Sequence, residues 1–300
     1  MRTALLRTFA YFDIFEYPLT AFEVWKYLEL PGGSATVDEV QTELVSTGEE
    51  GILKCTNGFW TLAGREASVA LRHERYQIAL RKFARARRVA SFLGKLPWIR
   101  MVAVCNTLSI NHARDESDID FFIVTAPGAL WKARFAAVLP FALLGLRPNG
   151  GRTRDPLCFS FFASEAALDF RGLALAPRDP YLTRWIASMV PLYDPDGLIE
   201  ALWDANPWVM ETLPHARPSF VSGERRIRGV ESGEIGESRP SVWESLARGV
   251  QMIHFPTSIS RIMNLDHRVL VTDDLLKFHE NDRRHEYREA YDARCRALGV

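Results

Sequence analysis

The spacing of apolar residues over 1–64 predicts three helices followed by a hairpin. A helix over 3–15 would carry its large apolar side chains on one face. Thr20 and Thr36 are each followed three residues later by a glutamate, the spacing of a capping box, so a helix is expected to begin at each. Two short apolar stretches flank Asn57-Gly58, which favours a hairpin turn because both residues accept positive φ. This order of elements predicts a winged-helix-like module.

Residues 65–96 predict one long basic helix that connects this module to the rest of the chain. From Arg65 to Arg100 the only acids are Glu66 and Glu74, whereas Lys and Arg are frequent. Such a run is typical of a solvated helix face. The alternative is a basic surface for a polyanion.

Two apolar runs of strand length, 99–104 and 118–124, indicate neighbouring buried strands, and a third strand is expected over 157–162. Between the first two lie a polar turn at Asn106-Thr107, a short helix and a loop. With further helices up to residue 212, this pattern predicts a mixed α/β domain over 97–212, in which helices flank a mixed sheet.

Asp118 and Asp120 stand two residues apart at the start of the second strand, so their side chains share one face. Two neighbouring carboxylates repel each other and are tolerated where a divalent cation neutralises them. Oxygen ligands suit Mg²⁺ or Mn²⁺, which would in turn bind phosphates. Free backbone N–H groups at Asn106-Thr107 could hold a phosphate nearby. The alternatives are surface charge at a strand start and a salt bridge to Arg114.

On these residues, segment 99–124 resembles the nucleotidyltransferase superfamily typified by DNA polymerase beta. In that family an apolar strand ends in Gly-Ser, and a short helical spacer leads to Asp-x-Asp within a second apolar strand. The resemblance implies transfer of a nucleoside monophosphate from an NTP to an acceptor hydroxyl, with Mg²⁺ or Mn²⁺ as cofactor. It implies that Asp118 and Asp120 are the catalytic metal ligands, and that Asn106, Thr107 and Ser117 bind the nucleotide.

A further nucleotide-binding candidate is Arg134. It follows Trp131 by three residues on the next expected helix, so both lie on one face and could grip a triphosphate or stack on a base. For Trp131, packing against the sheet is the favoured alternative.

The sequence departs from the family pattern at two places. Asn106 replaces the glycine; asparagine tolerates a left-handed backbone, but its side chain would crowd a phosphate. The third strand contains no acid, so Asp155, Glu165 or Asp169 would have to supply the family's third carboxylate. The expected function is therefore a nucleotidyltransferase acting on RNA, protein or a small molecule. The alternative is a catalytically degenerate relative that binds a nucleotide or a protein.

The charge balance argues against nucleic-acid binding by bulk charge. The chain has 37 Lys+Arg and 37 Asp+Glu in 300 residues, whereas phosphate neutralisation needs a basic excess. The third predicted helix, which would enter a DNA groove, carries Asp38, Glu39 and Glu43. A winged-helix DNA-binding regulator is therefore the least favoured alternative, and packing against protein is preferred for this module.

The apolar stretch 129–146 is interrupted by charges and Pro140 and is too short to span a bilayer. It predicts a buried helix, and no membrane partner is expected. The start of the chain lacks the pattern of a secretory signal. Four widely spaced cysteines without a CxxC pair suggest reduced thiols and a cytoplasmic location.

The C-terminal part is expected to be a flexible Gly- and Pro-rich linker over 213–240 and a helical region over 241–300. One helix is predicted from Asp273 to Leu298, with His279, Asp282 and His285 near one face. A solvated face is favoured there over a metal site.

Overall fold

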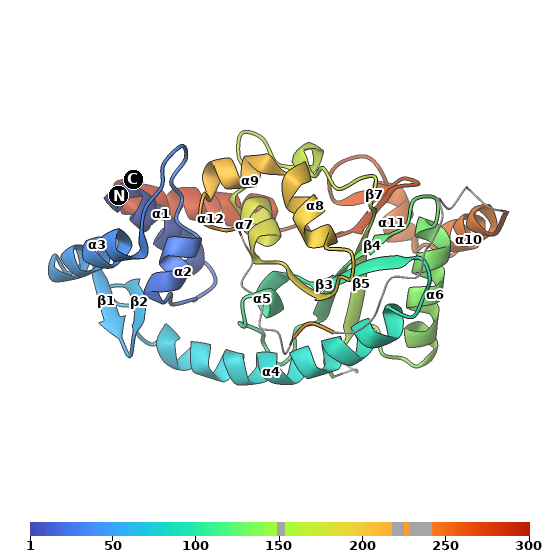
Figure 1. Cartoon of the computed structure of the whole chain (residues 1–300), viewed down its shortest axis with the longest axis horizontal. Helices are drawn as coiled ribbons and strands as arrows, with labels where there is room; N and C mark the ends of the chain where they lie inside the picture. Colours follow the sequence, from blue (N-terminus) through green and yellow to red (C-terminus); the bar gives the residue numbers. More distant parts are fainter. Residues whose placement is uncertain (149–153, 218–224, 228–241) are drawn as a thin grey trace.

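The computed structural model describes residues 1–148, 154–217, 225–227 and 242–300. The chain is a mixed α/β protein, as predicted, with a two-stranded hairpin and a six-stranded mixed sheet in the order β6-β3-β4-β5-β8-β7 (Figure 1). Of the described residues, no helix is both long and apolar enough to cross a membrane.

The N-terminal module consists of helices α1 (Arg2–Asp13), α2 (Ala21–Lys26) and α3 (Val37–Glu49), followed by strands β1 (Leu53–Thr56) and β2 (Phe59–Leu62). Both capping boxes form, and the antiparallel hairpin turns at Asn57 and Gly58 with φ of +52° and +81°. The predicted order of elements is present. Val40 and Leu44 of α3 are buried, whereas Val37, the first residue of the helix, is exposed.

The long connecting helix is α4 (Ser68–Leu93), which runs from the hairpin to the six-stranded sheet (Figure 1). Phe83, Ala86 and Ala90 are buried, since they lie on the face that covers the sheet. Lys82 is also fully buried, whereas Arg87 and Arg88 are exposed. The basic run is therefore not one uniform solvated face.

The centre of the sheet is built from β3 (Ile99–Val104), β4 (Ile119–Thr125) and β5 (Leu157–Ser164). β3 pairs antiparallel with β4, and β4 pairs parallel with β5, in a register that places Cys158 beside Asp120. The short helix α5 (Asn106–Ser109) joins the first two strands, and α6 (Leu130–Leu143) joins the second and third. The edge strand β6 (Val190–Tyr193) pairs antiparallel with β3.

The C-terminal region differs from its prediction, because two strands complete the sheet. β8 (Leu275–Phe278) pairs antiparallel with β5, and β7 (Val269–Val271) pairs with β8. The single helix predicted from Asp273 is wrong, since α12 begins only at Arg284. The remaining helices of the chain lie outside the sheet and comprise η1 (Arg171–Leu173), α7 (Pro180–Ser188), α8 (Leu198–Ala205), α9 (Pro207–Thr212), α10 (Val242–Ile253), α11 (Thr257–Ile262) and α12 (Arg284–Ala297).

Helices α1 and α12 pack side by side, so the two ends of the chain lie close together (Figure 1). This contact brings the N-terminal module against the region that follows the sheet. Most of the predicted linker, residues 218–224 and 228–241, falls outside the described residues.

Helix α6 is buried on one side only. Trp131, Ala133 and Ala137 face the core, but Leu143 is 78% exposed. The expectation of a fully buried helix is therefore wrong for its C-terminal half.

Candidate functional site

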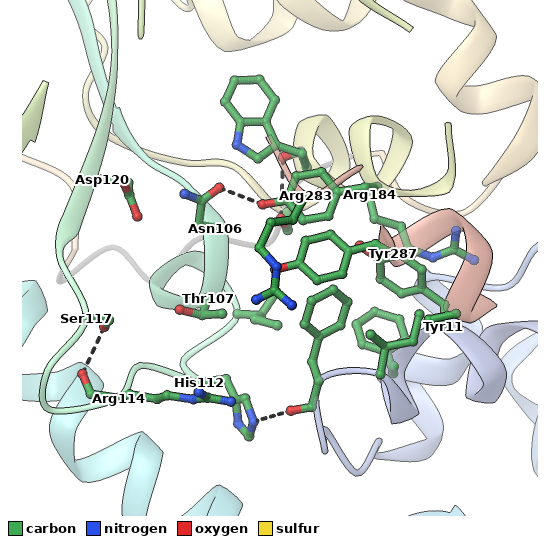
Figure 2. A pocket seen from close by; sticks show the side chains of 18 of the residues that line it. Tyr11, Asn106, Thr107, His112, Arg114, Ser117, Asp120, Arg184, Arg283 and Tyr287 are labelled. Atoms are coloured by element: carbon green, nitrogen blue, oxygen red, sulfur yellow. Dashed lines mark hydrogen bonds between the residues drawn. The ribbon is translucent and has the colours of Figure 1, made fainter. Parts of the chain in front are cut away.

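The turn between β3 and α5 adopts the left-handed backbone that its sequence allows. Asn106 has a φ of +58°. Its side-chain Oδ1 accepts a hydrogen bond from the Tyr181 hydroxyl at 3.0 Å, which directs its amide nitrogen toward Asp120 (Figure 2). The Asn106 side chain thus lies between the turn and the carboxylate.

Asp118 and Asp120 flank Ile119, whose side chain is fully buried in the sheet. Both acids are partly buried. The start of β4 is held on both sides, since the N–H of Ile119 donates to the carbonyl of Pro156 at 2.8 Å and the N–H of Cys105 donates to the carbonyl of Asp120 at 3.2 Å. The acidic pair is thereby fixed beside the α5 turn.

The two carboxylates hold their protons more tightly than free aspartates do. Burial, followed by the charge of Asp120, raises the pKa of Asp118, against the smaller opposing effects of Lys82 and Arg147. Burial also raises the pKa of Asp120, although neighbouring Asn106 and Cys158 act in the other direction. Two charges that disfavour each other's ionisation form a site that a cation would stabilise.

Within the described ranges, neither acid forms an ion pair with a basic side chain. The Arg114 salt bridge considered from the sequence does not form, and Arg114 lies exposed at the edge of the site (Figure 2). Its backbone carbonyl instead accepts a hydrogen bond from the Ser117 hydroxyl at 2.9 Å.

Lys82 and Asp155 brace the loop that leads into β4. The Lys82 ammonium donates to the Ser117 carbonyl and lies 3.3 Å from Asp155 Oδ1. Asp155 also accepts two hydrogen bonds from Arg81, at 2.9 and 3.0 Å. Burial opposes ionisation of Asp155, but these hydrogen bonds and charges lower its pKa overall. Asp155 is thus neutralised by its own partners.

The other two candidates for a third carboxylate have partners elsewhere, and Glu165 lies at the far end of the sheet. The N–H of Glu165 donates to the carbonyl of Thr125, the last residue of β4, roughly 17 Å along the strand from Asp120. The Glu165 carboxylate accepts from Arg100, and Asp169 accepts from the backbone of Arg171. Neither reaches the acidic pair.

The residue opposite Asp120 on β5 is Cys158. Burial, followed by the charge of Asp120, raises the pKa of this thiol to about 12, so it is neutral. No set of three or more His, Cys, Asp or Glu residues in the described part of the chain is arranged to hold a metal. The site offers two carboxylates.

A pocket of about 570 Å³ opens beside Asp120 (Figure 2). Its walls come from α1 and the loop after it, Tyr27 after α2, Arg75 of α4, the α5–β4 segment, and helices α7 and α12. The predicted site residues Asn106, Thr107, Ser117 and Asp120 all line it. Asp118, the residue before β4, is not among the lining residues.

Aromatic side chains form the wall that faces the α5 turn. Tyr181 and Tyr287 stack with ring centroids 5.3 Å apart and planes 19° apart, and Phe15 meets Tyr287 edge-on at 5.1 Å. Arg283 lies over the ring of Tyr287, with its guanidinium carbon 5.3 Å from the ring centroid. Such flat surfaces accept a planar ring.

Two more basic residues, Arg184 and Arg75, line the pocket. Arg184 is buried, stacks on Tyr11, and donates to Glu29 at 2.9 Å. Arg75 donates to the Phe15 carbonyl and to Nε2 of His112. Burial and then the charge of Arg75 lower the pKa of His112 to about 3, so this histidine is neutral.

Arg134 does not reach the pocket. Its guanidinium donates to Gln251 at 2.5 Å and lies over the rings of Phe255 and Phe278. The helix face predicted to point at the site instead contacts α10, Phe255 after it, and β8. Trp131 on the same helix is buried and donates to Asp273, as its favoured packing role implied.

The three C-terminal residues predicted near one helix face are separated. His279 contacts the Ser160 hydroxyl at 3.1 Å, Asp282 pairs with Lys277 and Arg284, and His285 contacts Arg288. Only His285 lies on α12, because β8 and its following loop take up the preceding residues.

Sequence reasoning missed the pocket's aromatic wall and its arginines. Tyr11, Tyr181 and Tyr287 come from three distant segments, so no local pattern links them. The spacing of Tyr287 and Tyr291 on α12 was a usable signal, since residues four apart share a helix face. The frequent charged residues on that helix instead favoured the interpretation of a solvated face.

We compared the chain with protein-family models, with curated proteins and with solved structures, and none of the three comparisons yields a match.

Proposed function

We propose that the chain binds a nucleoside triphosphate together with a divalent cation in the pocket beside Asp120. One observation carries the proposal: two neighbouring carboxylates without an ion-pair partner in the described part of the chain lie beside a left-handed turn, and one of them, Asp120, lines an aromatic pocket. A carboxylate pair of this kind is suited to a cation that a phosphorylated ligand completes.

The donor set fits magnesium or manganese. Asp118 and Asp120 offer hard oxygen ligands, and Mg²⁺ is commonly held by one or two carboxylates with phosphate oxygens and water in the other positions. When bound, the cation would neutralise charge on the ligand's phosphates. The neutral thiol of Cys158 stands where a third oxygen ligand would otherwise extend the set.

The residues around the acidic pair are suited to the rest of such a ligand. The stacked Tyr181 and Tyr287 offer a flat apolar surface to a base, and Arg114 and Arg283 offer positive charge to phosphates. The pocket volume of about 570 Å³ lies within the range of small-molecule sites.

Transfer of a nucleoside monophosphate to an acceptor hydroxyl is the second candidate function. It is supported by the order of strand, short helix, acidic strand, helix and strand from β3 to β5, which is similar to the nucleotidyltransferase superfamily. Against it stands the geometry around β5: Asp155 is neutralised by Arg81 and Lys82, and among the residues that the structure describes neither Glu165 nor Asp169 is placed to activate a hydroxyl. We therefore favour nucleotide binding with slow or no transfer.

The test separates binding from transfer. The full chain is incubated with each of the four radiolabelled ribonucleoside triphosphates, in Mg²⁺, in Mn²⁺ or in EDTA. Binding is measured as label retained with the protein on a filter. Transfer is measured as label that becomes attached to RNA, protein or small molecules from a cell extract. We expect cation-dependent retention of at least one nucleotide and little transferred label. Equal retention in EDTA would contradict the proposal, and rapid transfer would establish the second candidate.

A further inference from the structure

Helix α10 is packed with its apolar side turned outward. Val242, Trp243, Leu246 and Ile253 are between 54% and 84% exposed, whereas the polar Glu244 and Gln251 are buried. This is the reverse of the usual arrangement of a surface helix.

Hydrogen bonds to α6 fix this orientation. The Glu244 carboxylate accepts from the N–H groups of Trp131 and Lys132 at 2.6 and 3.1 Å, which satisfies the free donors at the start of α6. Gln251 donates to the Trp131 carbonyl at 2.8 Å and accepts from Arg134. Turning α10 over would break all of these contacts, so the exposed apolar face is built into the fold.

Helix α6 extends the apolar surface. Phe135, Leu139 and Leu143 follow one another at intervals of four residues and are 37%, 40% and 78% exposed. Between Phe135 and α10 lies a groove of about 550 Å³, lined by Trp243 and Val250 among others. An exposed apolar area of this kind marks an interaction surface.

Basic residues border this surface on the α4 side. Phe92 of α4 packs edge-on against Phe141 of α6, with ring centroids 5.6 Å apart. Arg88 lies four residues before Phe92 and so shares its helix face, and Lys95 is exposed in the turn that follows the end of α4. Neither forms an ion pair with any residue the structure describes, and no acid occurs in the sequence from Arg75 to Arg114.

We propose that the outward faces of α10 and α6, with the C-terminal end of α4, bind the surface of a membrane that contains anionic phospholipid. Trp and Leu side chains on a helix that lies in the interface enter the boundary between headgroups and acyl chains. Lys and Arg beside them attract anionic headgroups. A second copy of the chain would bring the same basic border to the interface, so the charge favours lipid.

The surface lies at one end of the molecule, with α10 and α6 together, away from α5 and α12 (Figure 1). The inference therefore does not rest on the proposed nucleotide site. It departs from the sequence-based expectation of no membrane partner, because contact with a membrane surface needs no spanning helix.

The test is sedimentation of the full chain with vesicles of phosphatidylcholine alone or with about one-third phosphatidylglycerol. We expect binding to the anionic vesicles that salt weakens. A double variant, Trp243→Ser with Leu246→Ser, should abolish it, and Arg88→Ser or Lys95→Ser should each weaken it about fivefold at low salt. Val45→Ser, at an exposed apolar position on α3, is the matched control and should bind like the unaltered chain.

Circular dichroism and size-exclusion chromatography accompany the vesicle test and confirm that each variant is folded. Failure of the folded, unaltered chain to sediment with anionic vesicles would overturn the proposal, as would equal binding by the double variant. A dimer that Trp243→Ser dissociates, with no vesicle binding, would assign this surface to a second copy instead.

Discussion

Replacing Asp120 with asparagine should stabilise the metal-free protein. The substitution keeps the side chain's shape and an oxygen that can accept from Asn106, but removes a partly buried charge that also opposes ionisation of Asp118. Relief of such a charge is worth about 1 kcal/mol, within the usual range for single substitutions. For a chain of this size, that corresponds to a rise of about 2–4 °C in Tm.

The advantage of Asp120→Asn should depend on pH in a defined direction. Folding raises the pKa of Asp120, so this carboxyl binds its proton more tightly in the folded state than in the unfolded state. Its ionisation therefore lowers the free energy of unfolding, increasingly so as the pH rises from the pKa of the unfolded state to that of the folded state. The difference between variant and unaltered protein should therefore be largest near neutral pH. It should shrink as pH falls through the folded pKa, where the aspartate becomes neutral as well.

A divalent cation should reverse the order of the two proteins. Mg²⁺ or Mn²⁺ at a hundred times its Kd would stabilise the unaltered chain by about 2.7 kcal/mol, and the variant by much less. The assay is thermal unfolding in EDTA and then with each cation, with urea unfolding to give free energies.

The matched control is Asp155→Asn, a nearby carboxyl whose charge is paired. It should destabilise the protein by about 3–5 kcal/mol, because it leaves Lys82 buried without its counter-charge. Two results would show that the acidic pair is not a cation site. One is a lower Tm of Asp120→Asn in EDTA, as expected for Asp155→Asn. The other is an equal rise in Tm on addition of the cation for the unaltered chain and for Asp120→Asn.

Three further substitutions test the surroundings of the pair. Because the pKa of His112 is lowered from 6.5 to about 3, this histidine should account for roughly 2 kcal/mol of the stability that the protein loses between pH 7 and pH 5, so His112→Gln should lose about that much less in urea titrations at the two pH values. Cys158→Asp adds an acid beside Asp120, so it should lower metal-free stability and tighten Mn²⁺ binding, whereas Cys158→Asn should not tighten it. Tyr287→Ala should weaken nucleotide binding by about 5- to 100-fold in a filter assay, whereas Tyr287→Phe should retain it. Equal nucleotide affinities of the two variants would show that the ring of Tyr287 does not contact the nucleotide.

Features that depend on neighbouring residues could be predicted from the sequence. The capping boxes at Thr20 and Thr36 form, and the Asn57-Gly58 turn closes a hairpin. The strand predicted over 99–104 is β3, and Asn106 takes the left-handed backbone considered for it. Each of these follows from local backbone preferences or from apolar periodicity.

Features that depend on distant contacts could not be predicted. β8 is a short strand whose partner β5 lies more than a hundred residues earlier in the chain, so its pattern alone did not distinguish it from helix. Arg134 points away from the pocket because Gln251, on a helix beyond the linker, accepts its hydrogen bond. The aromatic pocket likewise exists only because α12 packs against α1 and α7.

The most direct test of the central claim is titration calorimetry of the full chain with each nucleoside triphosphate, in Mg²⁺ and in EDTA. The account predicts saturable binding of at least one nucleotide in Mg²⁺ alone, and its loss in the double variant Asp118→Asn with Asp120→Asn, which should remain folded. Binding of the same strength in EDTA, or in the double variant, would contradict it, as would the absence of binding by all four nucleotides.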